Sequence, residues 1–185
     1  MDRAQFVYSF DKGNSHNKML LGGKGANLCA MTQIGLDVPP GFVITTEACL
    51  AYLDRGRLPE GLLDEVRAHV VELERKTGKR FGGESNPLLV SVRSGSAMSM
   101  PGMMDTILNL GLNRATLAGL IRTSANARFG YDAWRRFIQL FAKIAMGVPD
   151  ELFDAAMASM KERCGATRDV DLTAEQLREL AIRIQ

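Results

Sequence analysis

The sequence predicts an α+β protein, with an α/β part over residues 1–111 and a helical part over residues 112–185. Two short apolar runs, at 42–45 and 88–92, are bounded by Pro and Gly residues and are typical of strands. Beyond residue 112 strand signals vanish, Pro becomes scarce and apolar residues recur at helical spacing. A chain of 185 residues is long enough to bury a stable core without disulfides or metals.

The Gly-rich segment at 22–25 is the first feature of the α/β part. It reads Gly-Gly-Lys-Gly and predicts a loop. A helix is expected after it, because apolar residues then recur at helical spacing and Gly35 suits the left-handed position that ends a helix. The residues of this stripe are Leu28, Met31 and Ile34. Pro39 and Pro40 exclude a continuing helix.

Two further helices are expected in the α/β part. After the strand at 42–45, Thr46 is the expected N-cap of a helix that carries Leu50 and Leu53. A second helix is expected to end at Gly78, because another apolar stripe precedes that glycine. The residues of this stripe are Leu62, Val66, His69, Val70 and Leu73.

The apolar run at 88–92 predicts a buried strand, because Pro87 and Gly95 bound it on either side. Arg93 lies at the carboxyl end of this strand, where binding sites of sheet proteins often lie. The planar fork of an arginine matches the oxygens of a phosphate, although an ion pair with a structural carboxylate is an equally ordinary role. A loop is expected over 94–104.

Four apolar stripes at helical spacing follow one another in the helical part. They are Leu117, Leu120 and Ile121; then Trp134, Phe137, Ile138, Phe141, Ile144 and Ala145; then Leu152, Phe153, Ala156 and Met160; and finally Leu177, Leu180, Ala181 and Ile184. Thr173 and Gln176 fit a capping box at the start of the last helix. Because the last stripe runs up to Gln185, we expect the sequence to be a piece of a longer protein.

The composition argues against several classes of partner. The 23 Lys and Arg residues against 21 Asp and Glu residues give a net charge of +2, too small to predict a nucleic-acid partner. Three widely separated cysteines, Cys29, Cys49 and Cys164, fit neither a disulfide framework nor a zinc site, and favour a reducing compartment. No signal peptide or membrane-spanning stretch is apparent, so we expect a cytoplasmic protein without a membrane partner.

Lys24 is a candidate phosphate ligand, because the Gly-rich segment puts its ammonium and flexible backbone just before a helix. The segment is not a P-loop, since Gly25 follows the lysine where that motif needs Ser or Thr. A Gly-rich turn with a solvated lysine is the alternative interpretation.

The segment from Met98 to Thr106 combines a Pro101-Gly102 turn with four methionines. Methionine adapts to irregular apolar surfaces such as the face of a base, but a buried core loop has the same composition. Thr106 could cap the following element or hydrogen-bond a ligand. Arg135 lies on the most apolar helix, where solvated or ion-paired arginines are usual.

Neither histidine has the surroundings of a metal ligand or a catalytic group. His69 lies on an apolar stripe and is expected to be a packing residue, and His16 lies in a polar segment. No catalytic Ser/His/Asp or Cys/His set is visible, and no carboxylate cluster suits Mg²⁺. We therefore assign no catalytic residue and no metal ligand within the chain.

Five motifs of the sequence resemble the N-terminal region of the pyruvate, phosphate dikinase family. They are LGGKGANL at 21–28, PGF at 40–42, SVRSG at 91–95, SMPGMMDTILNLGLN at 99–113 and RFGYDAWRRF at 128–137. The first and third motifs are shared with phosphoenolpyruvate synthase and other dikinases. The Met-rich run discriminates in favour of the pyruvate, phosphate form.

The resemblance implies a partial ATP-grasp nucleotide-binding domain followed by a helical subdomain. In that family the β-phosphoryl group of ATP goes to a histidine on a separate domain, and the γ-phosphate goes to inorganic phosphate. The phosphohistidine then phosphorylates pyruvate in a third domain, giving AMP, pyrophosphate and phosphoenolpyruvate. ATP, Mg²⁺, the phosphohistidine and pyruvate-binding domains, and a homodimeric full-length enzyme are the implied partners.

By the same resemblance, Lys24 and Arg93 match positions that contact the phosphates of ATP. Thr106 and the Pro101-Gly102 turn match a segment over the nucleotide, and Arg135 matches a position near it. Some relatives carry an arginine at the position of Ala97 or Met98, so no phosphate contact is carried over there.

The metal ligands and the phosphohistidine of the family lie outside this sequence. We therefore expect the chain alone to be inactive, with ATP binding that is weak or absent. Two alternatives stay open: a non-enzymatic nucleotide-binding or interaction module, and a dikinase of the phosphoenolpyruvate synthase type.

Overall fold

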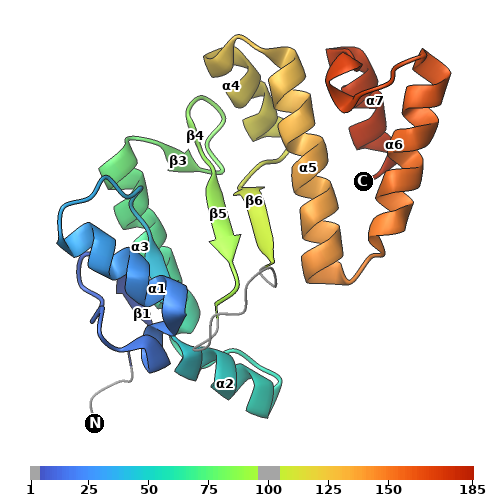
Figure 1. Ribbon diagram of the computed structural model, residues 1–185. Helices are drawn as coiled ribbons and strands as arrows, with labels where there is room; N and C mark the ends of the chain where they lie inside the picture. Colours follow the sequence, from blue (N-terminus) through green and yellow to red (C-terminus); the bar gives the residue numbers. More distant parts are fainter. Residues whose placement is uncertain (1–4, 96–104) are drawn as a thin grey trace. The chain divides into compact units, whose positions relative to one another are not determined.

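The computed structural model describes residues 5–95 and 105–185 and shows the expected α+β class. The described residues form two compact units. The first unit takes the residues up to Gly78 together with Ser94 and Gly95, and the second takes Lys79–Arg93 and Asp105–Gln185. Figure 1 shows the first unit in blue to green and most of the second in yellow to red.

The first unit joins a two-stranded antiparallel sheet to three helices. Strand β1 (Val7–Ser9) pairs with β2 (Phe42–Ile44), and Val7 lies opposite Ile44. The helices are α1 (Lys18–Gln33), α2 (Thr46–Arg55) and α3 (Leu62–Thr77). Two small clusters form its core: one has Val7, Ala48 and Leu62, and the other has Leu21, Ala26 and Cys29.

The expectation of a loop over 22–25 is wrong, because α1 runs through this segment. Within α1 only Gly22 departs from helical geometry, with φ 69° and ψ 161°. Gly25 is helical and close-packed: a Cβ atom there would lie 2.8 Å from a methyl carbon of Val43 in β2. A Gly-rich composition predicts a loop, but here one glycine breaks the helix and another lets it approach the sheet.

Helix α2 begins one residue earlier than predicted. Thr45 is the N-cap, and its hydroxyl accepts a hydrogen bond from the N–H of Ala48 at 3.3 Å. Thr46 is the first residue of α2 and not its cap, and its hydroxyl donates to the carbonyl oxygen of Met19 in α1. The expected apolar face of α2 is not buried either: Leu50 is 64% exposed and Leu53 is 70% exposed.

Helix α3 ends before Gly78, as predicted, and this glycine has the left-handed conformation. His69 is the expected packing residue, because its ring lies against Phe42 with 5.4 Å between the ring centroids. One carboxylate oxygen of Glu65 accepts the backbone N–H groups of Phe6 and Val7 at 2.8 and 2.9 Å, which ties α3 to β1.

The predicted strand at 88–92 is divided into two strands in the second unit. Strand β3 (Arg80–Phe81) pairs in parallel with β4 (Pro87–Leu88), and β5 (Val90–Arg93) pairs antiparallel with β6 (Thr106–Leu110). The expectation that this strand is buried holds for Leu88 but is wrong for β5, whose residues from Ser91 to Arg93 are exposed. In the described part of the chain, β5 pairs only with β6, so little covers it.

The rest of the second unit is helical, as expected beyond residue 112. The helices are α4 (Arg114–Ser124), α5 (Ala127–Met146), α6 (Asp150–Cys164) and α7 (Ala174–Arg183), with a short 3₁₀ turn at Asp169–Asp171. The predicted capping box of Thr173 and Gln176 is present at the start of α7. The division of the chain at residue 112 into subdomains stays a prediction.

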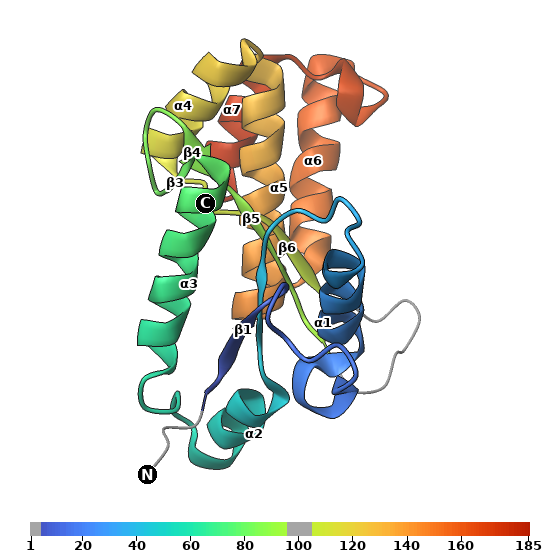
Figure 2. The same cartoon turned by 90° about the vertical axis from the view of Figure 1, so that its left-hand side faces the viewer.

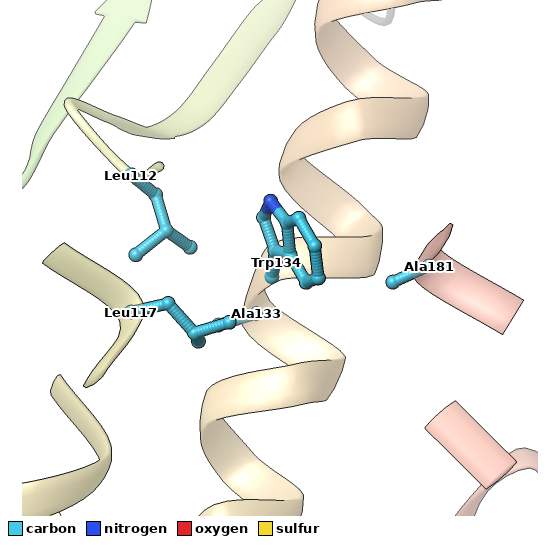
Figure 3. Close-up of a cluster of buried hydrophobic side chains, with 5 residues drawn as sticks. All are labelled: Leu112, Leu117, Ala133, Trp134 and Ala181. Atoms are coloured by element: carbon cyan, nitrogen blue, oxygen red, sulfur yellow. The ribbon is translucent and has the colours of Figure 1, made fainter. Parts of the chain in front are cut away.

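Helix α5 packs against α4, α7 and β6, and it carries the main core of the second unit (Figures 1 and 2). Trp134 is only 5% exposed and lies with Leu112, Leu117, Ala133 and Ala181 (Figure 3). A second cluster joins α6 and α7 and consists of Met157, Met160, Leu172, Leu177 and Leu180. The described residues include no helix with the length and hydropathy needed to cross a bilayer.

Candidate functional site

Lys24 lies in the first helical turn after the break at Gly22, in the first unit. Its side chain is exposed. Within residues 5–95 and 105–185, no ion pair or hydrogen bond engages its ammonium group. The charge of Lys24 is therefore available to an anionic ligand.

Arg93 and Thr106 lie opposite each other at one end of the β5–β6 ladder, in the second unit. Arg93 is the last residue of β5 and Thr106 is the first of β6. Arg93 is exposed, and no carboxylate of the described residues pairs with it. The alternative of a structural ion pair for Arg93 is thus not found in this part of the chain.

Arg135 is held within its own helix. It is 6% exposed, and its guanidinium donates two hydrogen bonds to Asp132 Oδ1, at 3.2 and 2.8 Å. A third hydrogen bond, of 3.1 Å, goes to Gln139 Oε1. Arg135 is therefore the buried, ion-paired arginine that is usual on such a helix, and its contact with a ligand stays a prediction.

The hydrogen bonds continue from Arg135 to the start of α6. Gln139 donates to one oxygen of Asp150 at 2.9 Å, and Lys143 donates to the other at 2.5 Å. The hydrogen bond from Lys143, followed by that from Gln139, lowers the pKa of Asp150 below its ordinary value, and the same Lys143–Asp150 bond raises the pKa of Lys143. These bonds join α5 to α6.

A family model described as "Pyruvate phosphate dikinase, AMP/ATP-binding domain" matches residues 18–63, which include Lys24. A pyruvate, phosphate dikinase of Entamoeba histolytica is 56% identical over 178 residues, and the match covers 96% of this chain and 20% of that protein. The corresponding protein of Clostridium symbiosum is 48% identical over 179 residues, with the same coverage of 96% and 20%.

The chain matches the N-terminal nucleotide-binding region of the pyruvate, phosphate dikinases. A chloroplastic dikinase of Flaveria trinervia extends the pattern, with 50% identity over 94% of this chain and 19% of the relative. The chain therefore spans about a fifth of the length of these dikinases.

The two free cations of the dikinase motifs lie in different units. Lys24 belongs to the first unit, whereas Arg93 and Thr106 belong to the second. The structure brings Arg93 and Thr106 together, and the convergence of Lys24 with them stays a prediction. Pro101 and Gly102 lie outside the described residues, as do Ala97 and Met98.

The described residues do not form a magnesium site. Within 5–95 and 105–185 there is no group of three or more His, Cys, Asp or Glu side chains placed to hold a metal ion. The Mg²⁺ that the dikinase resemblance implies does not fit the side chains of this part of the chain, so its chemistry is not assigned to them.

Two partners of Arg135 were not foreseen from the sequence. Asp132 and Gln139 lie three residues before it and four residues after it, which is the spacing of neighbours on one helical face. This spacing was a usable signal. Asp150 carried no such signal, because its contact with Gln139 depends on the turn that brings α6 back onto α5.

Proposed function

We propose that this chain is the ATP-binding part of an enzyme that converts ATP, phosphate and pyruvate to AMP, pyrophosphate and phosphoenolpyruvate. The single observation that carries the proposal is that Lys24 of the LGGKGANL motif and Arg93 of the SVRSG motif are exposed and unpaired in the described structure. The match of residues 18–63, which include Lys24, to an AMP/ATP-binding domain supports a nucleotide as the ligand.

The chemistry of these side chains suits the phosphates of ATP. The guanidinium of Arg93 can donate two parallel hydrogen bonds to one phosphoryl group, and Lys24 adds a compact positive charge. The hydroxyl of Thr106, opposite Arg93, adds a neutral donor. Phosphoryl transfer depends mainly on positioning and charge neutralisation, which are the tasks that these groups can perform.

The acceptor of the phosphoryl group is proposed to lie in another domain of the longer enzyme. His69 is not suited to that role, because its ring packs on Phe42 and its Nδ1 atom lies 2.8 Å from the carbonyl oxygen of Glu65. We also propose a separate pyruvate-binding domain, a homodimeric full-length enzyme, a requirement for Mg²⁺ and a cytoplasmic location.

An ATP titration monitored by nuclear magnetic resonance tests the proposal, because this method detects weak binding. ATP should shift the resonances of residues around Lys24 and Arg93. Lys24→Gln and Arg93→Gln should each weaken binding about tenfold, since each removes a charge-assisted contact. Arg57→Gln is the control, because Arg57 is also exposed and has no partner in the described part of the chain. Affinities unchanged by both test variants would contradict the proposed site.

A further inference from the structure

The break in α1 at Gly22 changes which residues of the helix face the core. Leu21 is 3% exposed, and Ala26 and Cys29 are fully buried. Ala26 and Cys29 are three residues apart and share a helical face, but Leu21 and Ala26 are five residues apart and would not share one in a continuous helix. The break therefore resets the phase of α1 between Leu21 and Ala26.

The position of Lys24 follows from this phase shift. Lys24 is three residues after Leu21, so a continuous helix would put both on one face and would turn the lysine towards the core of the first unit. With the break, Leu21 stays buried and Lys24 is exposed. Gly22 has φ 69° and ψ 161°, a combination essentially restricted to glycine.

Thr46 secures the break from the neighbouring helix. Its hydroxyl group lies 2.5 Å from the carbonyl oxygen of Met19 and 3.3 Å from that of Leu20. In a continuous helix these carbonyls would accept the N–H groups of Gly23 and Lys24. The hydroxyl thus offers a donor to the last carbonyls before the break, and a side chain of α2 supports the break from outside α1.

The helix after the break is fixed as well. Gly25 packs so closely on β2 that a Cβ atom would lie 2.8 Å from Val43. The backbone on both sides of Gly22 is therefore held by other elements, and the exposed position of Lys24 is built into the first unit rather than left to a mobile loop.

We propose that Gly22 and Thr46 are positioning residues that present the ammonium of Lys24 to a phosphate group of the nucleotide. This inference rests on the proposed function, because it takes Lys24 as a ligand of ATP. It adds that the affinity for phosphate depends on the broken geometry of α1. The ligand chemistry is a polyphosphate, either free or as part of a nucleotide.

A double-mutant cycle tests the link between the break and the lysine. Gly22→Ala and Lys24→Gln should each weaken ATP binding about tenfold, and the double variant should be no weaker than either single variant. If the double variant loses ATP affinity by the product of the two single losses, Gly22 acts independently of Lys24 and the inference is overturned. An unchanged affinity in Gly22→Ala would overturn it too.

Gly35→Ala is the matched control for strain. Gly35 also has a positive φ, of 82°, and no atom lies within 4 Å of the Cβ that alanine would add. Gly35 follows the far end of α1. Gly35→Ala should therefore lower stability through backbone strain and leave ATP binding unchanged. If Gly35→Ala loses as much ATP affinity as Gly22→Ala, general backbone strain explains both losses and the inference is overturned.

Thr46→Val keeps the inference testable if Gly22→Ala does not fold. Valine has nearly the shape of threonine but no donor, so Thr46→Val should weaken binding of ATP and of inorganic tripolyphosphate by the same factor. A loss confined to ATP would mean that Thr46 acts on the nucleoside, and no loss would mean that the break does not depend on it; either result overturns the inference.

The proposed function can fail separately. If Lys24→Gln binds ATP as tightly as the unsubstituted chain, or if that chain binds neither ATP nor tripolyphosphate, the assignment of Lys24 is wrong and the inference falls with it. If Lys24→Gln weakens binding and either Gly22→Ala or Thr46→Val leaves it unchanged, the site stands and the inference alone is wrong.

Discussion

Asp132 holds two arginines of α5 with one carboxylate. One of its oxygens pairs with Arg135 at 2.8 Å and the other with Arg136 at 3.0 Å. The side chains of Asp132 and Arg135 are only 19% and 8% exposed, whereas that of Arg136 is 57% exposed. Loss of Asp132 would therefore leave the charge of Arg135 buried without its carboxylate.

We expect Asp132→Ala to lower the free energy of unfolding by about 3 kcal/mol, since it removes one partner of a buried ion pair. Asp64→Ala is the control, because Asp64 and its partner Arg67 are both more than 70% exposed. That change should cost less than about 0.5 kcal/mol. Urea unfolding of the three proteins measures both effects, and similar costs at the two sites would contradict the assignment.

Ala125 has a backbone conformation that glycine adopts more easily than alanine. It ends α4 in the left-handed conformation with φ 49°, which costs an L residue about 1 kcal/mol. Ala125→Gly should therefore raise the free energy of unfolding by up to about 1 kcal/mol. A loss of stability in urea unfolding would show that the greater freedom of glycine in the unfolded chain outweighs the relief.

At the same scale, the sequence predicted residue types better than their partners. The exposed Lys24 and Arg93 were named from local signals, since glycines flank Lys24 and Arg93 ends a short apolar run. Thr46 was expected to be a cap, yet it reaches the carbonyls of α1 while Thr45 takes the capping role. That choice depends on where α1 lies beside α2, which no local pattern contains.

At the scale of the elements, Gly119 of α4 allows the segment between β3 and β4 to pack against this helix. A Cβ atom on Gly119 would lie 2.0 Å from the carbonyl oxygen of Glu84, which also accepts a hydrogen bond from Arg122 at 3.0 Å. The segment between β3 and β4 thus packs directly on the backbone of α4.

Gly119→Ala should destabilise the protein by about 2 kcal/mol, against the usual trend. Alanine in place of glycine normally stabilises a helix by about 1 kcal/mol, but here the overpacking term is larger. Ala118→Gly, at an exposed position of the same helix, should cost about 1 kcal/mol through propensity alone. A stabilised Gly119→Ala variant in thermal unfolding would show that the β3–β4 segment moves away at little cost.

The contact between α5 and α6 should depend on pH through Asp150. Its pKa is lower in the folded protein than its ordinary value of 3.8, so its contribution is present above that value and is lost as pH falls through the lower folded pKa. Asp150→Asn should therefore lose less stability than the unsubstituted protein between about pH 5 and about pH 2. Parallel losses in urea unfolding at the two pH values would contradict this role.

The strands and helices were predictable where a local pattern sufficed. The end of α3 before Gly78 and the capping box of α7 follow from short-range chemistry. The prediction of a loop at 22–25 was wrong, because Gly25 allows close packing on Val43 and does not make the chain flexible. The exposure of Leu50 and Leu53 could not be predicted either, because an apolar stripe predicts a helix but does not identify the residues that pack against it.

On the scale of the whole molecule, the chain spans about a fifth of the dikinases that it matches. Its fold class and its similarity to these dikinases were both predictable, because the five motifs follow one another in order from residue 21 to residue 137. The convergence of Lys24 and Arg93 stays a prediction. The two residues belong to different compact units, and their motifs carry no information on how those units are arranged.

The chain alone should not form phosphoenolpyruvate. The proposed reaction needs a histidine acceptor, a pyruvate site and a metal held by carboxylates, and none of them is assigned to the described residues. The test incubates the purified chain with ATP, Mg²⁺, phosphate and pyruvate and follows AMP and phosphoenolpyruvate by phosphorus resonance. Turnover above that of a sample without protein would mean that these parts are present in the chain.

The burial of Trp134 decides what an optical measurement of stability reports. Trp134 is the single tryptophan of the sequence and lies in the core of the second unit. Its fluorescence therefore registers the unfolding of that unit, whereas circular dichroism registers helices of both. Variants of Gly119 and Asp132 should shift both signals. A variant of Gly35 should shift the circular dichroism and leave the tryptophan emission in place wherever the two units melt independently.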